Sequence, residues 1–174
     1  MQIVRKNSFQ TSRWKNGGGI THEIARSDTE EIFGWRMSVA EVKSDGPFSL
    51  FPHHHRILTV IEGEGMDLLG AAASYHANHL VPVRFLGDEQ IMGKLASRPC
   101  RDFNLIFDPL RYSAKIAVEH GKQKISNCFA VYMVSGGVAD MRAGDMALLQ
   151  DSNDFVQLGD GAQALVISLN TISK

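Results

Sequence analysis

Three consecutive histidines at positions 53–55 are the residues of this sequence that most directly suggest metal chemistry. Imidazole nitrogens bind Fe, Mn, Zn, Ni or Cu, and in an extended chain His53 and His55 would point to the same side. The spacing to the next carboxylate is long for a metal site, which favours solvent-exposed loop histidines. We therefore expect no cofactor, with a divalent metal at His53 and His55 as the alternative. The third ligand would then be Glu62, His76 or His79.

Two arginines in strand-like apolar segments suggest recognition of an acid. Arg36 shares a strand face with Ser38, and Arg56 lies beside alternating aliphatic residues. Burying a guanidinium is costly unless it is paired, and its planar fork matches a carboxylate. We interpret Arg36, Ser38 and Arg56 as ligands of a small carboxylate. The alternative is that each arginine bridges to an acidic residue of the fold, namely Glu23, Glu41, Glu62 or Asp102.

Other side chains could complete the same site. Trp14 offers a flat apolar wall, and the amide of Asn16 both donates and accepts hydrogen bonds. Asp102 and Asn104 lie on one face of a predicted strand, where they either close a polar network around an arginine or face water. Trp14 in the core and Asn16 in a turn are the local alternatives. We include Trp14, Asn16 and Asn104 among the predicted ligand-binding residues.

Short strands account for most of the hydrophobic pattern. Residues 33–40 alternate with a period of two, and the β-branched run 56–61 predicts a second strand. The turn formers at 44–47 predict a reversal between them, and residues 26–32 a charged turn into this hairpin. Pro82 places the segment 80–85 at a sheet edge or in a bulge. The segment 111–118 is either a strand or a single helical turn, and further strands are expected at 2–4, 20–25, 91–95 and 102–107.

A weak internal echo indicates duplication. Residues 131–137 repeat the pattern of 58–63, residues 156–160 that of 85–88, and residues 165–169 take the place of 103–107. Many short strands with glycine turns and almost no helix are typical of a jelly-roll barrel, or of a pair of them. We predict an all-β protein that forms a single compact unit over residues 1–174, with an internal repeat of approximately 1–107 and 108–174.

Composition restricts the function classes. The 174 residues are 44% hydrophobic and 21% charged, and the formal net charge is −1 without a basic block, which argues against nucleic-acid and membrane partners. The glycines at 17–19 follow their lysine instead of preceding it, so they do not form a nucleotide loop. Cys100 and Cys128 form no CxxC pair, the N-terminus lacks a secretory signal, and no run is long enough to span a bilayer. We expect a cytoplasmic protein with reduced thiols.

No catalytic nucleophile stands out. Ser38 and Ser49 have no histidine at an identifiable spacing, and neither cysteine lies in an activating motif. The protein is therefore expected to be a binding protein and not an enzyme. The alternative is a metal-dependent enzyme that uses the cluster of His53 and His55.

These segments together resemble the HutD/Ves family of bacterial proteins, which belongs to the cupin superfamily. The matching segments are WKNGGG at 14–19, WRMS at 35–38, GPFSLFP at 46–52 and DFN at 102–104, with Thr21, Glu23, Ala40, Arg56 and the Glu62-Gly63 turn. The similarity covers most of the chain. Where family members usually have a glycine followed by variable residues, this chain has the three histidines.

The resemblance implies a cupin fold, a double-stranded β-helix or jelly roll, here as two small barrels packed together. It also implies a link to histidine utilisation, through regulation by metabolite binding, or to stress responses in the Ves branch. The acids of histidine degradation, such as urocanate and formylglutamate, are then the expected small-molecule partners. By analogy with cupins that pair through sheet edges, a homodimer is also expected.

Overall fold

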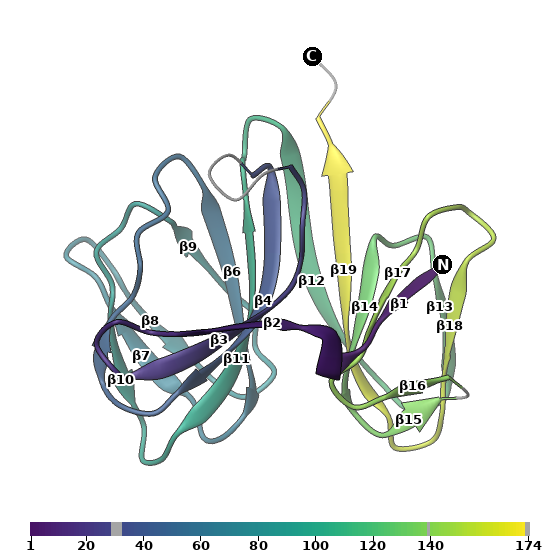
Figure 1. Cartoon of the computed structure of the whole chain (residues 1–174), viewed down its shortest axis with the longest axis horizontal. Coiled ribbons are helices and arrows are strands. Elements are labelled where there is room, and N and C mark those ends of the chain that lie inside the picture. Colours follow the sequence, from purple (N-terminus) through teal and green to yellow (C-terminus); the bar gives the residue numbers. More distant parts are fainter. Residues whose placement is uncertain (29–32, 139, 173–174) are drawn as a thin grey trace. The chain divides into compact units, whose positions relative to one another are not determined.

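The computed structural model describes residues 1–28, 33–138 and 140–172, and their regular secondary structure is almost entirely β-strand. The chain divides into two compact units, a middle unit of Gln10–Arg111 and a terminal unit of Met1–Phe9 with Tyr112–Lys174. Within the described residues, the helical structure is the 3₁₀ turn Lys6–Ser8 (Figure 1). No helix there has the length and hydrophobicity of a membrane span. The all-β prediction is confirmed.

The middle unit contains two antiparallel sheets. The first has six strands in the order β2-β3-β4-β11-β6-β9, and the second has four in the order β5-β10-β7-β8. Their bounds are β2 Gln10–Arg13, β3 Gly19–Arg26, β4 Trp35–Val42, β5 Gly46–Pro47, β6 His55–Glu62, β7 Met66–Leu69, β8 Ser74–Ala77, β9 Val83–Leu86, β10 Met92–Leu95 and β11 Cys100–Phe107.

The terminal unit contains a five-stranded sheet in the order β1-β17-β14-β19-β12, and two short ribbons, β13-β18 and β15-β16. The bounds are β1 Gln2–Val4, β12 Tyr112–His120, β13 Gln123–Ser126, β14 Ala130–Ser135, β15 Gly137–Val138, β16 Met141–Arg142, β17 Met146–Leu148, β18 Phe155–Leu158 and β19 Gln163–Thr171. The N-terminal strand β1, which the sequence predicts at residues 2–4, lies at the edge of its sheet.

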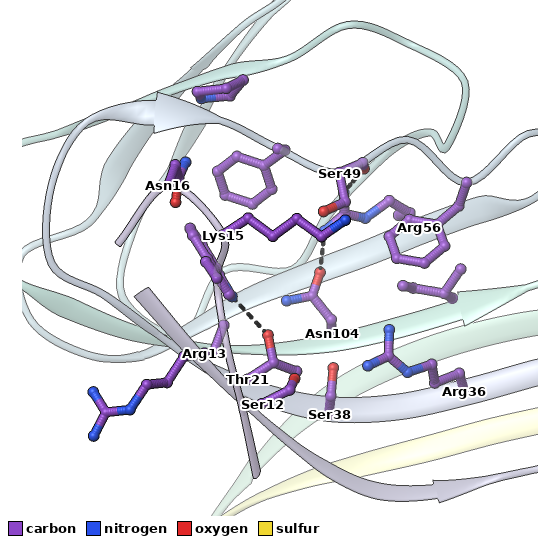
Figure 2. Close-up of a pocket in the computed structure, with 16 residues that line it drawn as sticks. Ser12, Arg13, Lys15, Asn16, Thr21, Arg36, Ser38, Ser49, Arg56 and Asn104 are labelled. Carbon is purple, nitrogen blue, oxygen red and sulfur yellow. Dashed lines mark hydrogen bonds between the residues drawn. The ribbon is translucent and has the colours of Figure 1, made fainter. Parts of the chain in front are cut away.

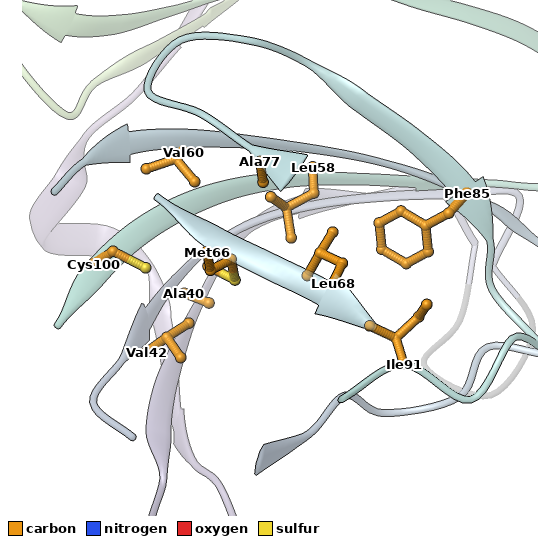
Figure 3. Close-up of a cluster of buried hydrophobic side chains, with 10 residues drawn as sticks. All are labelled: Ala40, Val42, Leu58, Val60, Met66, Leu68, Ala77, Phe85, Ile91 and Cys100. Atoms are coloured by element: carbon orange, nitrogen blue, oxygen red, sulfur yellow. The ribbon is translucent and has the colours of Figure 1, made fainter. Parts of the chain in front are cut away.

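An apolar cluster fills the space between the two sheets of the middle unit (Figure 3). Leu58 from β6 packs there with Met66 and Leu68 from β7, and all three are completely buried. Each strand contributes every second residue to this face, because side chains alternate across a strand. The same face of these strands continues beyond the cluster, where its positions are available for a polar site.

The predicted hairpin of residues 33–61 is wrong. Strands β4 and β6 are each antiparallel to β11, which lies between them, so they run parallel to one another and do not pair. The turn formers at 44–47 lead instead into β5, which pairs with β10 in the other sheet. The chain between β4 and β6 is thus a crossover from one sheet to the other. Of the charged turn predicted at 26–32, residues 29–32 lie outside the described residues.

Several local predictions are confirmed. The segment that begins near residue 111 is a strand, β12, and the segment with Pro82 leads into the edge strand β9. The triple β12-β19-β14 has the same arrangement as β4-β11-β6, as the echo of 165–169 with 103–107 suggests. The echo fails for residues 156–160, because β18 pairs with β13 whereas β9 pairs with β6.

Candidate ligand-binding pocket

One pocket of about 510 Å³ lies within the middle unit (Figure 2). All six residues predicted from the sequence to bind a ligand line it: Trp14, Asn16, Arg36, Ser38, Arg56 and Asn104. Its other lining residues are Ser12, Arg13, Lys15, Thr21, Ala40, Pro47, Phe48, Ser49, Phe51 and Ile106. The structure therefore brings the predicted set together, although binding itself stays a prediction.

Strand register explains why these distant positions meet. In the six-stranded sheet, Ile106 of β11 is opposite Arg36 on β4 and Arg56 on β6. Asn104, two residues earlier on β11, is opposite Ser38 on β4. Because residues two apart share a strand face, all five side chains project from the same side of the sheet. The floor of the pocket is thus set by backbone pairing.

Arg56 is the most constrained of the polar side chains. It is only 5% exposed, and its guanidinium carbon lies 5.2, 5.3 and 5.0 Å from the ring centres of Phe48, Phe51 and Phe85. One terminal nitrogen donates to Asn104 Oδ1 at 2.8 Å, and the other to the carbonyl of Ser49 at 3.2 Å. The charge is therefore held by aromatic faces and neutral acceptors, without a direct carboxylate partner within the described residues.

The pKa of Arg56 reflects this surrounding. Burial lowers it to about 10, while the Asp102 carboxylate raises it and the Arg36 charge lowers it. The guanidinium is still positively charged at neutral pH.

Arg36 takes the structural bridge that the sequence offered as the alternative. Its Nε donates to Glu23 Oε2 at 2.6 Å, and the other oxygen of Glu23 accepts from Arg26 at 2.7 Å. The guanidinium carbon also lies 5.9 Å from the Phe51 ring centre. In Figure 2 its terminal nitrogens point into the pocket. Arg36 can therefore form the ion pair with Glu23 through Nε and still line the pocket.

The charges that line the pocket are of one sign. Its lining residues include four basic side chains and no acidic one. Figure 2 shows Lys15 extending across the pocket, whereas Arg13 points away from it. Trp14 forms one wall, packed edge to face against Phe48 with ring centres 6.2 Å apart and with its Nε1 donating to Thr21 at 2.8 Å. The result is a positively charged pocket with aromatic walls.

The loop of Trp14 and Asn16 is shaped by its glycines. Gly17 has a φ of +73°, and a Cβ on Gly19 would lie 2.6 Å from the carbonyl oxygen of Glu41 and 2.9 Å from the Trp14 ring. Asn16 Oδ1 accepts from the Gly18 N–H at 3.0 Å, so the turn role considered for this residue is real as well. Gly19 therefore allows the backbone of this loop to lie close to β4 and to the Trp14 ring.

A buried polar pair lies behind Arg56. Asp102 and Asn104 are 0% and 4% exposed, and the Asn104 amide donates to Asp102 Oδ1. Of the two alternatives from the sequence, the polar network around an arginine is the one present. Burial raises the pKa of Asp102 to about 7, against the lowering effects of the Arg56 charge and the Asn104 hydrogen bond.

Comparison with known proteins places the chain in a family. The sequence profile of HutD matches residues 6–169. The chain belongs to the HutD family. It is 38% identical over 130 residues to an uncharacterized 21.2 kDa protein in the hutC 3′ region of Pseudomonas putida, an alignment that covers 72% of this chain and 67% of that protein. Protein Ves of Cronobacter sakazakii is 34% identical over 120 residues, which is 68% of this chain and 66% of Ves.

The fold agrees with this family assignment. The structure of HutD from Pseudomonas fluorescens superposes with a TM-score of 0.85 at 32% identity, and the alignment covers 99% of each chain. HutD has the cupin fold, and the cupin fold predicted from the sequence is therefore confirmed.

The histidines of this HutD-family protein do not form the arrangement expected of a metal site. His53 has a φ of +64° and β6 begins only at His55, so the extended conformation that would align these two side chains is not adopted. His54 contacts the carbonyls of Pro52 and Phe33, and His55 Nδ1 lies 2.8 Å from a nitrogen of Arg84.

The other proposed metal ligands have partners of their own, Arg101 for Glu62, Asp67 for His76 and the Ile61 carbonyl for His79. The described residues contain no group of three histidines, cysteines or acids that could hold a metal. Metal binding by His53 and His55 stays a prediction.

Sequence reasoning missed four notable lining residues: Arg13, Lys15, Ser49 and Ile106. Ile106 could have been found, because it shares the strand face of Asn104. Lys15 lies between two predicted site residues, which was a usable signal. Ser49 acts through its backbone carbonyl, which no side-chain pattern can reveal.

Proposed function

We propose that the protein binds a small carboxylate metabolite, such as urocanate or formylglutamate, in the pocket of the middle unit. The occupied and empty forms would then regulate histidine utilisation without catalysing a reaction. Family membership supports the pathway, because one relative is described from the hutC 3′ region. The free thiols of Cys100 and Cys128 support a cytoplasmic setting.

The observation that carries the proposal is the state of Arg56. This buried cation is surrounded by aromatic rings and neutral acceptors and has no carboxylate in direct contact, so a ligand carboxylate would supply that partner. Hydrogen bonds between a guanidinium and a carboxylate are among the strongest in proteins, and water exclusion strengthens them further. The terminal nitrogens of Arg36 provide a second donor group at the same surface.

The walls fit a flat ligand. Trp14, Phe48 and Phe51 line the cavity, whose size lies within the range of small-molecule pockets. An unsaturated or amide-containing acid would place its planar part against these rings and its carboxylate at the arginines. The amide of Asn104 and the hydroxyl of Ser38 lie at the same floor.

The chemistry of the lining supports binding without turnover. Its described side chains include serine and threonine hydroxyls but no histidine, cysteine or carboxylate. General acid–base catalysis needs a group that exchanges protons near neutral pH and reaches the substrate. The residues that line the cavity instead provide positive charge and aromatic walls for binding a ligand.

A thermal-shift titration tests the proposal. Metal-stripped protein is heated with increasing urocanate, formylglutamate, formiminoglutamate or histidine, and in parallel with divalent metal salts. We expect saturable stabilisation by at least one acid without metal, because a ligand that binds only the folded state raises the melting temperature. Stabilisation by metal alone would contradict the proposal and direct attention to His53 and His55.

The regulatory part needs a cellular measurement. Deletion of the gene in its host is expected to change urocanate levels during growth on histidine. A variant with Arg56 replaced by lysine should behave like the deletion. Normal urocanate levels in both strains would contradict a regulatory role.

A further inference from the structure

Asp102 is an unusual group to find inside this fold. The side chain is 0% exposed, and its Oδ2 has no hydrogen-bond partner within the described residues. Its cross-strand neighbours, Ala40 and Val60, belong to the apolar cluster between the two sheets of the middle unit. A carboxylate in such a place is costly to ionise unless a cation compensates it.

The compensation available to Asp102 is indirect. Asn104 donates to Asp102 Oδ1 through its amide nitrogen, and its own oxygen accepts from Arg56 at 2.8 Å. The amide therefore stands between the carboxyl group and the guanidinium. An anion in the pocket would reach Arg56 directly and would compete with Asp102 for the same positive charge.

The elements packed around Asp102 contribute few other groups that can affect its protonation. Arg56 on β6 acts on Asp102, and Arg36 on β4 acts on Arg56. On β11 itself, burial and the Asp102 charge raise the pKa of Cys100 to about 12, so its thiol is neutral. Beyond β6, His79 bridges to Val60 and contacts the carbonyl of Ile61. The facing strand β7 presents apolar members of the cluster.

We propose that the ionised form of Asp102 takes up a proton from solvent when an anion binds beside Arg56, so that ligand binding at this pocket is coupled to proton uptake. The inference rests on the proposed carboxylate site. Before binding, Arg56 is balanced by the ionised Asp102. After binding, it is balanced by the ligand, and the added proton makes Asp102 neutral.

The pKa of Asp102, which burial raises to about 7, brings both of its forms within reach at neutral pH. Affinity for the acid is therefore expected to fall as the pH rises through this range. The fall approaches tenfold per pH unit where binding takes up about one full proton. Asp102 acts here as a positioning residue, because it touches Asn104 and not the ligand.

The test follows the carboxyl ¹³C resonance of Asp102 across pH, in the free protein and with saturating formylglutamate. The acid groups of this probe ionise well below neutral pH, so the probe adds no titration of its own. We expect the midpoint to lie near neutrality in the free protein and to rise by about one unit or more with the ligand. Calorimetry in two buffers of different ionisation enthalpy should show proton uptake on binding.

The Asp102→Asn variant is the matched control, because its amide still offers an acceptor to Asn104 while it cannot ionise. It should bind without proton uptake and with an affinity that does not change near neutral pH. If this variant fails to fold, the wild-type midpoints and the calorimetry decide the matter.

Two failures are distinguishable. An unchanged Asp102 midpoint, while the Trp14 indole N–H resonance shifts with the ligand, would overturn the proton coupling and leave the binding proposal standing. If the Trp14 resonance responds to none of urocanate, formylglutamate, formiminoglutamate and histidine, the binding proposal fails. The proton coupling, which rests on it, then fails too.

Discussion

Arg56 and Arg36 differ in how their charges are balanced. Arg36 forms a direct ion pair with Glu23 at 2.6 Å, and it shares this carboxylate with Arg26. Arg56 instead relies on Asn104, a carbonyl and aromatic faces, with Asp102 one amide away. Removing a partner from a buried charge is more costly than replacing the whole group. Contact with Arg56 is therefore expected to contribute more to the binding free energy of an anionic ligand than contact with Arg36.

Asp102 gives a prediction for stability. Its pKa is about 7 in the folded protein and near 3.8 in the unfolded chain, so between these values the folded state binds more protons. Stability therefore falls as the pH rises from the unfolded pKa to the folded one, and is level above it. Between about pH 5 and about pH 8, wild type should lose about 3 kcal/mol of unfolding free energy relative to Asp102→Asn.

Urea denaturation of both proteins at several pH values measures this difference. Comparing the two proteins cancels the contributions of the histidines, which both share. A constant difference across the range would show that Asp102 does not titrate there.

For individual residues, the sequence was informative where side chains alternate between the two faces of a strand. Arg36, Ser38, Arg56 and Asn104 could be placed on strand faces because a period of two leaves little choice. The choice between ligand contact and ion pair for Arg36 could not be made, because Glu23 reaches it through the pairing of β3 with β4.

Among the elements, β11 organises the site. It separates β4 from β6 and places Ile106 between their arginines, with Asn104 two residues earlier on the same face. The wrong hairpin prediction has a physical cause: strand periodicity identifies a strand but not its partner, and turn formers at 44–47 also fit a crossover. The partner of both strands, β11, lies 39 to 72 residues further along the chain, and such distant pairing leaves no local signal.

The loop that joins β2 to β3 gives a second prediction. Gly19→Ala should destabilise the protein by about 1–3 kcal/mol and weaken ligand binding, because the new methyl group would press on a backbone carbonyl and on the Trp14 ring. Denaturation and calorimetry measure the two effects.

Gly18→Ala is the matched control for this loop. Its Cβ would lie 3.1 Å from Ser44 Oγ and 3.3 Å from Asn16 Oδ1, side-chain atoms that can move. Equal losses in the two variants would contradict the packing argument.

For the whole molecule, charge is distributed unevenly. The formal net charge is −1, yet the pocket is lined by four basic and no acidic side chains. The attraction for an anion is therefore local. At moderate ionic strength, salt screens charges that are more than about 10 Å apart. Composition argues against a nucleic-acid partner but could not reveal this pocket.

The class of fold was predictable from the pattern of the sequence. Short strands, glycine turns and missing helical periodicity leave few architectures for a chain of this size. The assembly of strands into sheets was not predictable, since β1 pairs with β17 across most of the sequence. Resemblance to the HutD family supplied what periodicity could not.

The most direct test of the central claim is the calorimetric affinity of Arg56→Lys for the acid that stabilises wild type best. Lysine keeps the positive charge but loses the planar fork, so affinity should fall at least about tenfold, which corresponds to about 1.4 kcal/mol. The exposed Lys115→Ala variant, in the terminal unit, should bind like wild type. Wild-type affinity in a folded Arg56→Lys protein would contradict the account, because the ligand would then bind elsewhere.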